Sequence, residues 1–261
     1  MPHDVSLSGV KAEEIHLAVG DTSEIPQLLD GFTADIAVAL SPNDDVFEFT
    51  GNSFAKQGFV NLSVDSRGGA DDIIVADSSI AGASNFNINA GLGEDLVIFE
   101  RNMFAQALNL NLNGGAGRDA ALFQDNTVAG AAKLNFNLSL GNDEFTFKNN
   151  TFSQGLIFNC NAGGGHDAVF FLGNVVTGAA RLNFNLDTGN DRLDIRRCSF
   201  QQVRLNVRGG TGVDRVWLTD NTIAGPGKLV VDLGTGMNTF FSRRNKFGKN
   251  LILMAEPPPS P

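Results

Sequence analysis

A unit of about 24 residues returns along most of this chain, and its clearest copy is LNFNLSLGNDEFTFKNNTF at positions 134–152. Aligning the copies produces two columns of polar residues. An Asp column contains Asp45, Asp71, Asp95, Asp119, Asp143, Asp167, Asp191, Asp214 and Asn238. An Asn column contains Asn52, Ser78, Asn102, Asn126, Asn150, Asn174, Cys198, Asn221 and Asn245. Because one such unit is too short to bury a core alone, a fixed period of this length predicts an array of stacked units.

Each copy contains three short segments that alternate between apolar and polar residues. The first has apolar residues at every second position, as at Leu134, Phe136 and Leu138, mostly with Asn between them. The second follows the Asp column and the third follows the Asn column. Period-two alternation predicts β-strands with one buried face. The apolar residue of the third segment is alternately large and small, as at Phe152 and Val176, which favours tight packing inside a tube.

The predicted fold is all-β: a parallel β-helix, or β-solenoid, of nine to ten rungs of about 24 residues. The centre of the first strand, Leu110 in one rung and Phe136 in the next, slides by two positions in alternate rungs. We therefore expect a true repeat of two rungs, about 48 residues. Residues 1–34 do not fit the repeat and are predicted to cap one end. Residues 35–255 form the solenoid, and residues 256–261 form a disordered Pro-rich tail.

Charge, cysteine content and apolar runs limit the partners, the disulfides and the membrane segments that this chain can have. The net charge of −10 argues against nucleic acid. Residues 1–130 hold 5 Lys or Arg and 19 Asp or Glu, whereas residues 131–261 hold 14 and 10, so the rod is acidic in one half and basic in the other. Cys160 and Cys198 fall at different repeat positions, and we expect no disulfide between them. Neither a signal peptide nor a stretch of the ~20 apolar residues that span a membrane is visible.

Stacked Asn residues at a corner, with aliphatic and aromatic columns between them, resemble the single-chain parallel β-helix proteins. That class includes polysaccharide lyases and hydrolases, adhesins, autotransporter passengers and viral tail fibres. The resemblance covers about residues 35–255 and implies the fold. It also favours a location outside the cell or on its surface.

The Gly-rich corners at 113–119, 161–167 and 209–214, and more loosely the corner at 90–95, are similar to the GGxGxD motif of haemolysin-type (RTX) calcium-binding repeats. The resemblance implies calcium as a cofactor, with ligands at Asp95, Asp119, Asp167 and Asp214. In RTX repeats the motif returns about every nine residues, whereas here it returns about every 48. The alternative is structural: Gly supplies positive φ at a sharp corner, and Asp accepts hydrogen bonds from backbone N–H groups.

Asparagine also occupies the polar face of the first strand, although Asn is normally depleted in strands. The predicted surface-binding residues are Asn85, Asn87, Asn109, Asn111, Asn135, Asn137, Asn183 and Asn185. A regular sheet of amides suits a glycan, ice or a second rod. The alternative is an outer polar ladder with a purely structural role.

Catalysis finds little support in the sequence, and we assign no catalytic residue. Arg192, Asp194 and Arg196 share the outward face of one strand, with Arg215 about one rung on. This group fits either an anionic ligand or a solvated charged face.

The predicted function is a non-enzymatic structural or surface module that self-associates or binds a surface or glycan ligand through its faces. Two alternatives remain open: a calcium-stabilised secreted repeat, and a β-helix protein that binds or degrades polysaccharides.

Overall fold

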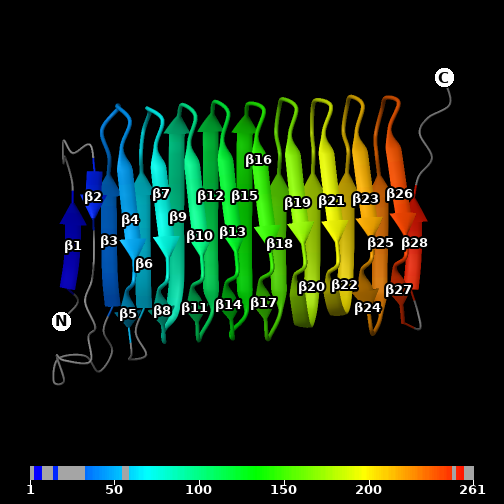
Figure 1. The fold of residues 1–261 in the computed structure, drawn as a ribbon, viewed down its shortest axis with the longest axis horizontal. Helices are drawn as coiled ribbons and strands as arrows, with labels where there is room; N and C mark the ends of the chain where they lie inside the picture. Colours follow the sequence, from blue (N-terminus) through cyan, green and yellow to red (C-terminus); the bar gives the residue numbers. More distant parts are fainter. Residues whose placement is uncertain (1–2, 8–13, 17–32, 55–58, 249–250, 256–261) are drawn as a thin grey trace.

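The computed structural model describes residues 3–7, 14–16, 33–54, 59–248 and 251–255. These residues form a rod in which the strands run across the long axis, from β1 (His3–Leu7) at one end to β28 (Leu251–Ala255) at the other (Figure 1). The strand pairs are parallel, and they build an 18-stranded sheet and a 10-stranded sheet. The chain is therefore a single-chain parallel β-solenoid, as the repeat predicts. The described residues contain no helix long and apolar enough to cross a bilayer.

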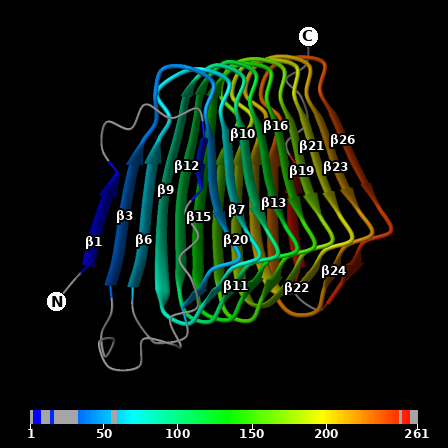
Figure 2. The ribbon, with the colours of Figure 1, turned by 60° about the vertical axis from the view of Figure 1, so that its left-hand side comes forward.

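Each rung contributes one long strand, one five-residue strand and, in most rungs, one two-residue strand (Figure 2). The long strands are β3 (Thr33–Ala39), β6 (Phe59–Asp65), β9 (Ala83–Leu92), β12 (Leu108–Ala116), β15 (Ala132–Leu140), β18 (Leu156–Asn161), β20 (Val175–Asn185), β22 (Ser199–Arg208), β25 (Gly227–Asp232) and β28. The five-residue strands are β4 (Val46–Thr50), β7 (Asp72–Ala76), β10 (Leu96–Glu100), β13 (Ala120–Gln124), β16 (Glu144–Lys148), β19 (Ala168–Leu172), β21 (Arg192–Arg196), β23 (Arg215–Thr219) and β26 (Thr239–Arg243). The two-residue strands are β5 (Ser53–Phe54), β8 (Ser79–Ile80), β11 (Met103–Phe104), β14 (Thr127–Val128), β17 (Thr151–Phe152), β24 (Thr222–Ile223) and β27 (Lys246–Phe247).

At the N-terminal end, β1 pairs with β3, and β2 (Glu14–His16) pairs with β4. Parts of the predicted cap therefore extend both sheets. Residues 1–2, 8–13 and 17–32 of the predicted cap, and the predicted tail at 256–261, lie outside the described residues.

The pairing register corrects one prediction. Leu110 pairs with Leu134 and not with Phe136, and Leu134 pairs in turn with Phe158. Successive long strands are offset by 24 residues through most of the stack. The offset is 26 between β3 and β6, and between β20 and β22 it changes from 24 to 23 after Val176. The two-residue slide and the 48-residue double repeat are therefore wrong. Apolar residues stand at both candidate positions, and a period of two does not distinguish them.

The core is a continuous stack of apolar side chains between the two sheets. Phe99, Phe123, Phe147 and Phe171 follow one another along the axis, with ring centroids 5.8, 5.0 and 4.9 Å apart. Each of these rings is at most 1% exposed. Such offset rings add about 0.5–1.5 kcal/mol per pair to the free energy gained by burial. The predicted alternation of large and small residues in the third segment is confirmed by the buried run Phe104, Val128, Phe152, Val176 and Phe200.

A corner that ends at the Asp column joins each long strand to the five-residue strand, and the residue two before that column is glycine from Gly69 to Gly236. At Gly165, φ is +142° and an added Cβ would lie 1.4 Å from the carbonyl oxygen of Gly141 in the preceding rung. Only glycine allows the rungs to approach this closely. This glycine recurs in every rung from Gly69 to Gly236, whereas the fuller GGxGxD match recurs about every 48 residues along the sequence.

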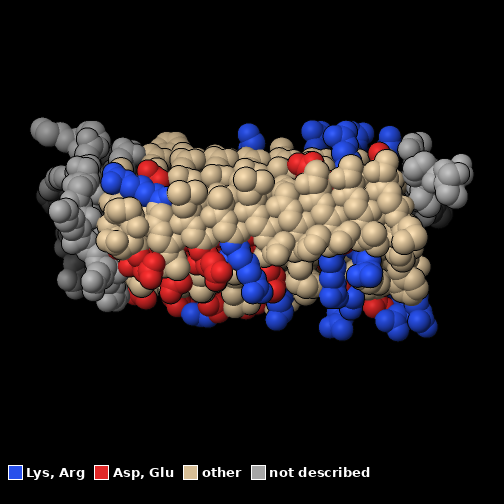
Figure 3. Space-filling model, turned by 90° about the horizontal axis from the view of Figure 1, so that it is seen from above, with Lys and Arg blue, Asp and Glu red and all other residues tan. Residues whose placement is uncertain are grey.

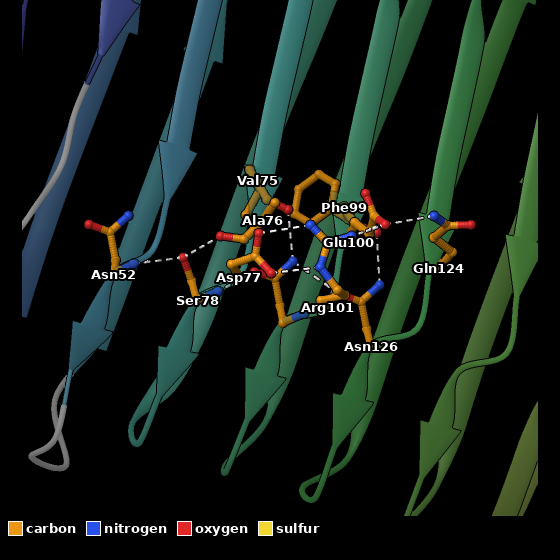
Figure 4. Close-up of polar contacts among 11 residues, drawn as sticks. Asn52, Val75, Ala76, Asp77, Ser78, Phe99, Glu100, Arg101, Gln124 and Asn126 are labelled. Atoms are coloured by element: carbon orange, nitrogen blue, oxygen red, sulfur yellow. Dashed lines mark hydrogen bonds and ion pairs between the residues drawn. The ribbon is translucent and has the colours of Figure 1, made fainter.

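The Asn column lies buried at a second corner, between the five-residue and two-residue strands (Figure 4). The backbone N–H of Asn102 donates to Asn126 Oδ1 at 2.9 Å, while Asn102 Nδ2 donates to the carbonyl of Val75 at 2.8 Å. Where Ser78 replaces Asn, its hydroxyl accepts from the preceding rung instead. The column therefore satisfies backbone groups that the corner would otherwise bury without partners.

Candidate functional site

The outward face of the long strands carries three columns of asparagine, which we call the outer Asn columns. The first contains Asn61, Asn85 and Asn109 and then continues as Lys133, Ile157, Arg181 and Arg204. The second contains Asn87, Asn111, Asn135, Asn159, Asn183 and Asn206. The third contains Asn89, Asn113, Asn137, Asn161 and Asn185.

Within each column the side chains form a hydrogen-bonded ladder. In the second column, Asn111 Nδ2 donates to Asn87 Oδ1 at 2.8 Å, and Asn135 Nδ2 donates to Asn111 Oδ1 at 2.7 Å. The same bond joins Asn159 to Asn135 at 2.7 Å and Asn183 to Asn159 at 2.8 Å. An amide has two N–H donors and an oxygen with two lone pairs. In the second column, each interior amide therefore keeps one donor and one lone pair for a ligand.

The second and third outer Asn columns form the two walls of a groove of about 960 Å³ that runs along the rod. We call it the Asn groove. Its floor is the strand between the walls, at residues such as Leu112, Phe136 and Cys160, whose side chains are buried in the core. Asp65 lies at one end and Arg208 at the other. A smaller hollow of about 460 Å³ separates the first and second columns.

The structure places all eight predicted surface residues on this face, but it groups them differently. The sequence paired Asn109 with Asn135 as equivalent positions, whereas Asn135 is the neighbour of Asn111. The slide in register produced two columns where there are three. The prediction also missed Asn89, Asn113 and Asn161, which belong to the third column. Their signal was available, because each follows the preceding outward Asn at the same spacing of two residues.

The Asp column lies buried inside the Gly-rich corner. Asp119 Oδ1 accepts the backbone N–H of Asp95 at 3.0 Å, and Asp143 Oδ1 accepts that of Asp119 at 2.7 Å. Burial raises the pKa of Asp95 and Asp143 to about 7 and that of Asp167 to about 6, partly offset by the N–H bonds. Charge repulsion between neighbouring carboxylates raises them further.

The four predicted calcium ligands, Asp95, Asp119, Asp167 and Asp214, are members of this buried column. Successive rungs contribute one aspartate each to it. Across the described ranges, no group of three or more His, Cys, Asp or Glu side chains is arranged to hold a metal ion. The geometry supports the structural alternative, in which the carboxylate accepts a corner N–H, and calcium binding stays a prediction.

The Arg192 group is held together by internal contacts. Asp194, 2% exposed, forms ion pairs with Arg196 and, at 3.3 Å, with Arg192. The guanidinium of Arg192 lies over the rings of Phe170 and Trp217, at 5.1 and 5.0 Å from their centroids. The carboxylate is thus already paired on both sides, so this group offers a packed charged face and not a free acid and base.

The two cysteines are buried free thiols. Burial raises the pKa of Cys198 to about 12 and raises that of Cys160 further. At neutral pH both thiols therefore stay protonated and act as small core residues.

The fold and the ladders define the class: a single-chain parallel β-solenoid with internal and external asparagine ladders. No protein-family model, curated protein or solved structure matches the chain.

Proposed function

We propose that this protein is a rigid, non-catalytic rod that binds an extended, hydroxyl-rich polymer, such as a neutral polysaccharide, in the Asn groove. The observation that carries the proposal is the pair of parallel amide ladders along the groove walls. In the second column, each interior amide keeps one N–H donor and one acceptor lone pair that the ladder does not use. A sugar hydroxyl is also both donor and acceptor, so it matches such a pair.

Two further features suit a linear neutral ligand. The walls are amides along most of their length, and the charged side chains Asp65 and Arg208 stand at opposite ends. The amides repeat with the strand spacing of about 4.8 Å, so a polymer with many similar units meets many similar contacts. The ladder hydrogen bonds fix the side chains before binding, which lowers the entropy lost when a ligand is bound.

Replacing three amides at the middle of the second column tests this proposal. The triple variant Asn111→Leu, Asn135→Leu and Asn159→Leu is expected to weaken polysaccharide binding about 100-fold, because each lost hydrogen bond contributes about 1 kcal/mol. The measurement is co-sedimentation with a panel of insoluble neutral polysaccharides, followed by affinity electrophoresis with soluble ones.

Thr146→Leu is the matched control, because Thr146 lies half-buried on the outward face of the other sheet between Leu122 and Phe170. This variant should bind like the wild type. Unchanged affinity in the triple variant would contradict the proposal, and so would a wild-type protein that binds no polymer in the panel.

Self-association is a second candidate function, and the charge distribution favours it. Acidic side chains gather toward the N-terminal half of the lower flank in Figure 3, and basic ones gather toward the C-terminal half. Two rods lying antiparallel would place opposite charges together. We expect the sedimentation coefficient to be larger at about 0.01 M salt than at about 1 M salt, where the Debye length falls to about 3 Å. A sedimentation coefficient equal to that of the monomer at both salt concentrations would contradict self-association through these charges.

A further inference from the structure

In the Asp column, one carboxylate oxygen of each inner aspartate has no hydrogen-bond partner among the described residues. Its inner members are Asp95, Asp119, Asp143, Asp167, Asp191 and Asp214, and each is at most 5% exposed. In every one of them Oδ1 accepts a backbone N–H from the preceding rung, at 2.7–3.1 Å. Oδ2 is also buried but has no hydrogen-bond partner among the described residues. An unpartnered carboxylate oxygen in this environment is costly.

The last member of the column shows what Oδ2 faces. Asn238 occupies the same corner position, and its Oδ1 accepts the N–H of Asp214 at 2.7 Å. Its Nδ2 donates to the carbonyl oxygen of Leu233, five residues earlier, at 2.7 Å. The aspartate side chains have the same orientation. Asp119 Oδ2 lies 2.7 Å from the position that a Cβ would occupy on Gly114, which is also five residues earlier in the chain. Asn238 therefore places an N–H donor against the carbonyl oxygen of Leu233. An ionised aspartate would place a second acceptor there instead.

We propose that the Asp column is a file of proton-binding sites, in which each inner aspartate carries a proton on Oδ2 and donates it to the carbonyl oxygen five residues earlier. The protonated acid then reproduces the hydrogen bonds of Asn238, with Oδ1 as acceptor and Oδ2–H as donor. Protonation also removes the repulsion between carboxylates on adjacent rungs, which are about 4.8 Å apart. The independent Asn238 geometry and the unpartnered buried oxygens carry this assignment.

Few other charges act on the column. Asp143 is influenced by Asp119 and Asp167 of the neighbouring rungs. Four further side chains each act by charge on one member of the column. Asp72 acts on Asp95, and Glu94 acts on Asp119. His166 acts on Asp167, and Asp187 acts on Asp191. The acidic ones oppose ionisation, and a protonated His166 favours it at Asp167.

The sign of the pH dependence follows from proton counting. An unfolded aspartate has a pKa of about 3.9, whereas the pKa of folded Asp143 is raised to about 7. Between these values the folded chain binds more protons, so stability falls as pH rises. For Asp143 alone, the folding equilibrium constant should drop roughly 100-fold between pH 5 and pH 8.

Urea unfolding at pH 5 and at pH 8 tests the proposal with Asp143→Asn. The wild type should be more stable at pH 5. The variant should have a smaller difference between the two pH values and exceed the wild type at pH 8, because asparagine supplies the donor without titrating. Asp77→Asn is the control: Asp77 is an exposed aspartate paired with Arg101 at 2.6 Å, its pKa is lowered, and its replacement should leave the difference unchanged.

A second measurement uses the wild type alone. The side-chain carboxyl ¹³C resonances of buried aspartates should titrate between pH 5 and pH 8. The proposal is overturned if wild-type stability is flat or rises over this range. It is also overturned if added calcium restores the pH 5 stability at pH 8, because the oxygens would then hold a metal ion and not a proton.

Discussion

Gly165→Ala is expected to destabilise the solenoid by on the order of 4 kcal/mol. The added Cβ would lie 1.4 Å from the carbonyl oxygen of Gly141 and 2.5 Å from its carbonyl carbon. Both contacts are to backbone, so no side-chain rotation relieves them, and φ of +142° disfavours any residue with a Cβ. Relief requires the rungs to separate, which would break the parallel ladder around this corner. Thermal unfolding followed by circular dichroism should show a midpoint many degrees below that of the wild type.

Alanine substitutions at two other glycines distinguish the effect of steric contact from the effect of backbone conformation. A Cβ on Gly51 meets nothing within 4 Å, but φ there is +66°, so Gly51→Ala should cost about 1–2 kcal/mol. A Cβ on Gly155 has its nearest contact at 3.5 Å and no positive φ, so Gly155→Ala should lie within about 0.5 kcal/mol of the wild type. Equal stability of the Gly165 and Gly155 variants would mean that the rungs are not packed this closely.

The architecture was predictable because the corners and strands repeat. The Asp and Asn columns indicated the rung length, since the side-chain oxygen of an Asp or Asn accepts the backbone N–H of its counterpart in the preceding rung. The strand register was not predictable from the apolar pattern, because Leu134 and Phe136 both face the core and fit either alignment. Counting back from the Asp column instead would have resolved it, because the paired residues Leu112 and Phe136 each lie seven positions before the Asp of their rung.

The candidate site was predictable only in part. Alternation placed Asn on the outward face, but it did not show that Asn111 and Asn135 bond to each other. The groove depends on the lateral distance between two ladders, which emerges only when strands are in register. The proposed role of the Asp column could not be predicted from the sequence. A sequence shows a carboxylate near glycines, whereas the burial of its second oxygen requires the folded corner.

Asn150→Leu should destabilise the protein by about 4 kcal/mol or more. Asn150 is fully buried, and its Oδ1 accepts from the backbone N–H of Asn126 at 2.9 Å and from Asn126 Nδ2 at 3.2 Å. Its Nδ2 donates to the carbonyl of Phe123 at 2.8 Å and to Asn174 Oδ1 at 3.0 Å. Leucine has a similar size but makes none of these bonds. Each buried group that loses its partner costs about 1–3 kcal/mol.

Asn150→Ser is the matched variant, because serine already occupies this column in another rung. There the hydroxyl of Ser78 accepts the N–H of Asn52 at 3.2 Å and donates to the carbonyl of Ala76 at 2.9 Å. A serine at position 150 should therefore keep the most important acceptor and cost only about 1–2 kcal/mol. Urea unfolding of both variants gives the comparison. If leucine is tolerated as well as serine, apolar packing and not hydrogen bonding holds this corner, and the interior ladder is a consequence of the fold and not a cause of it.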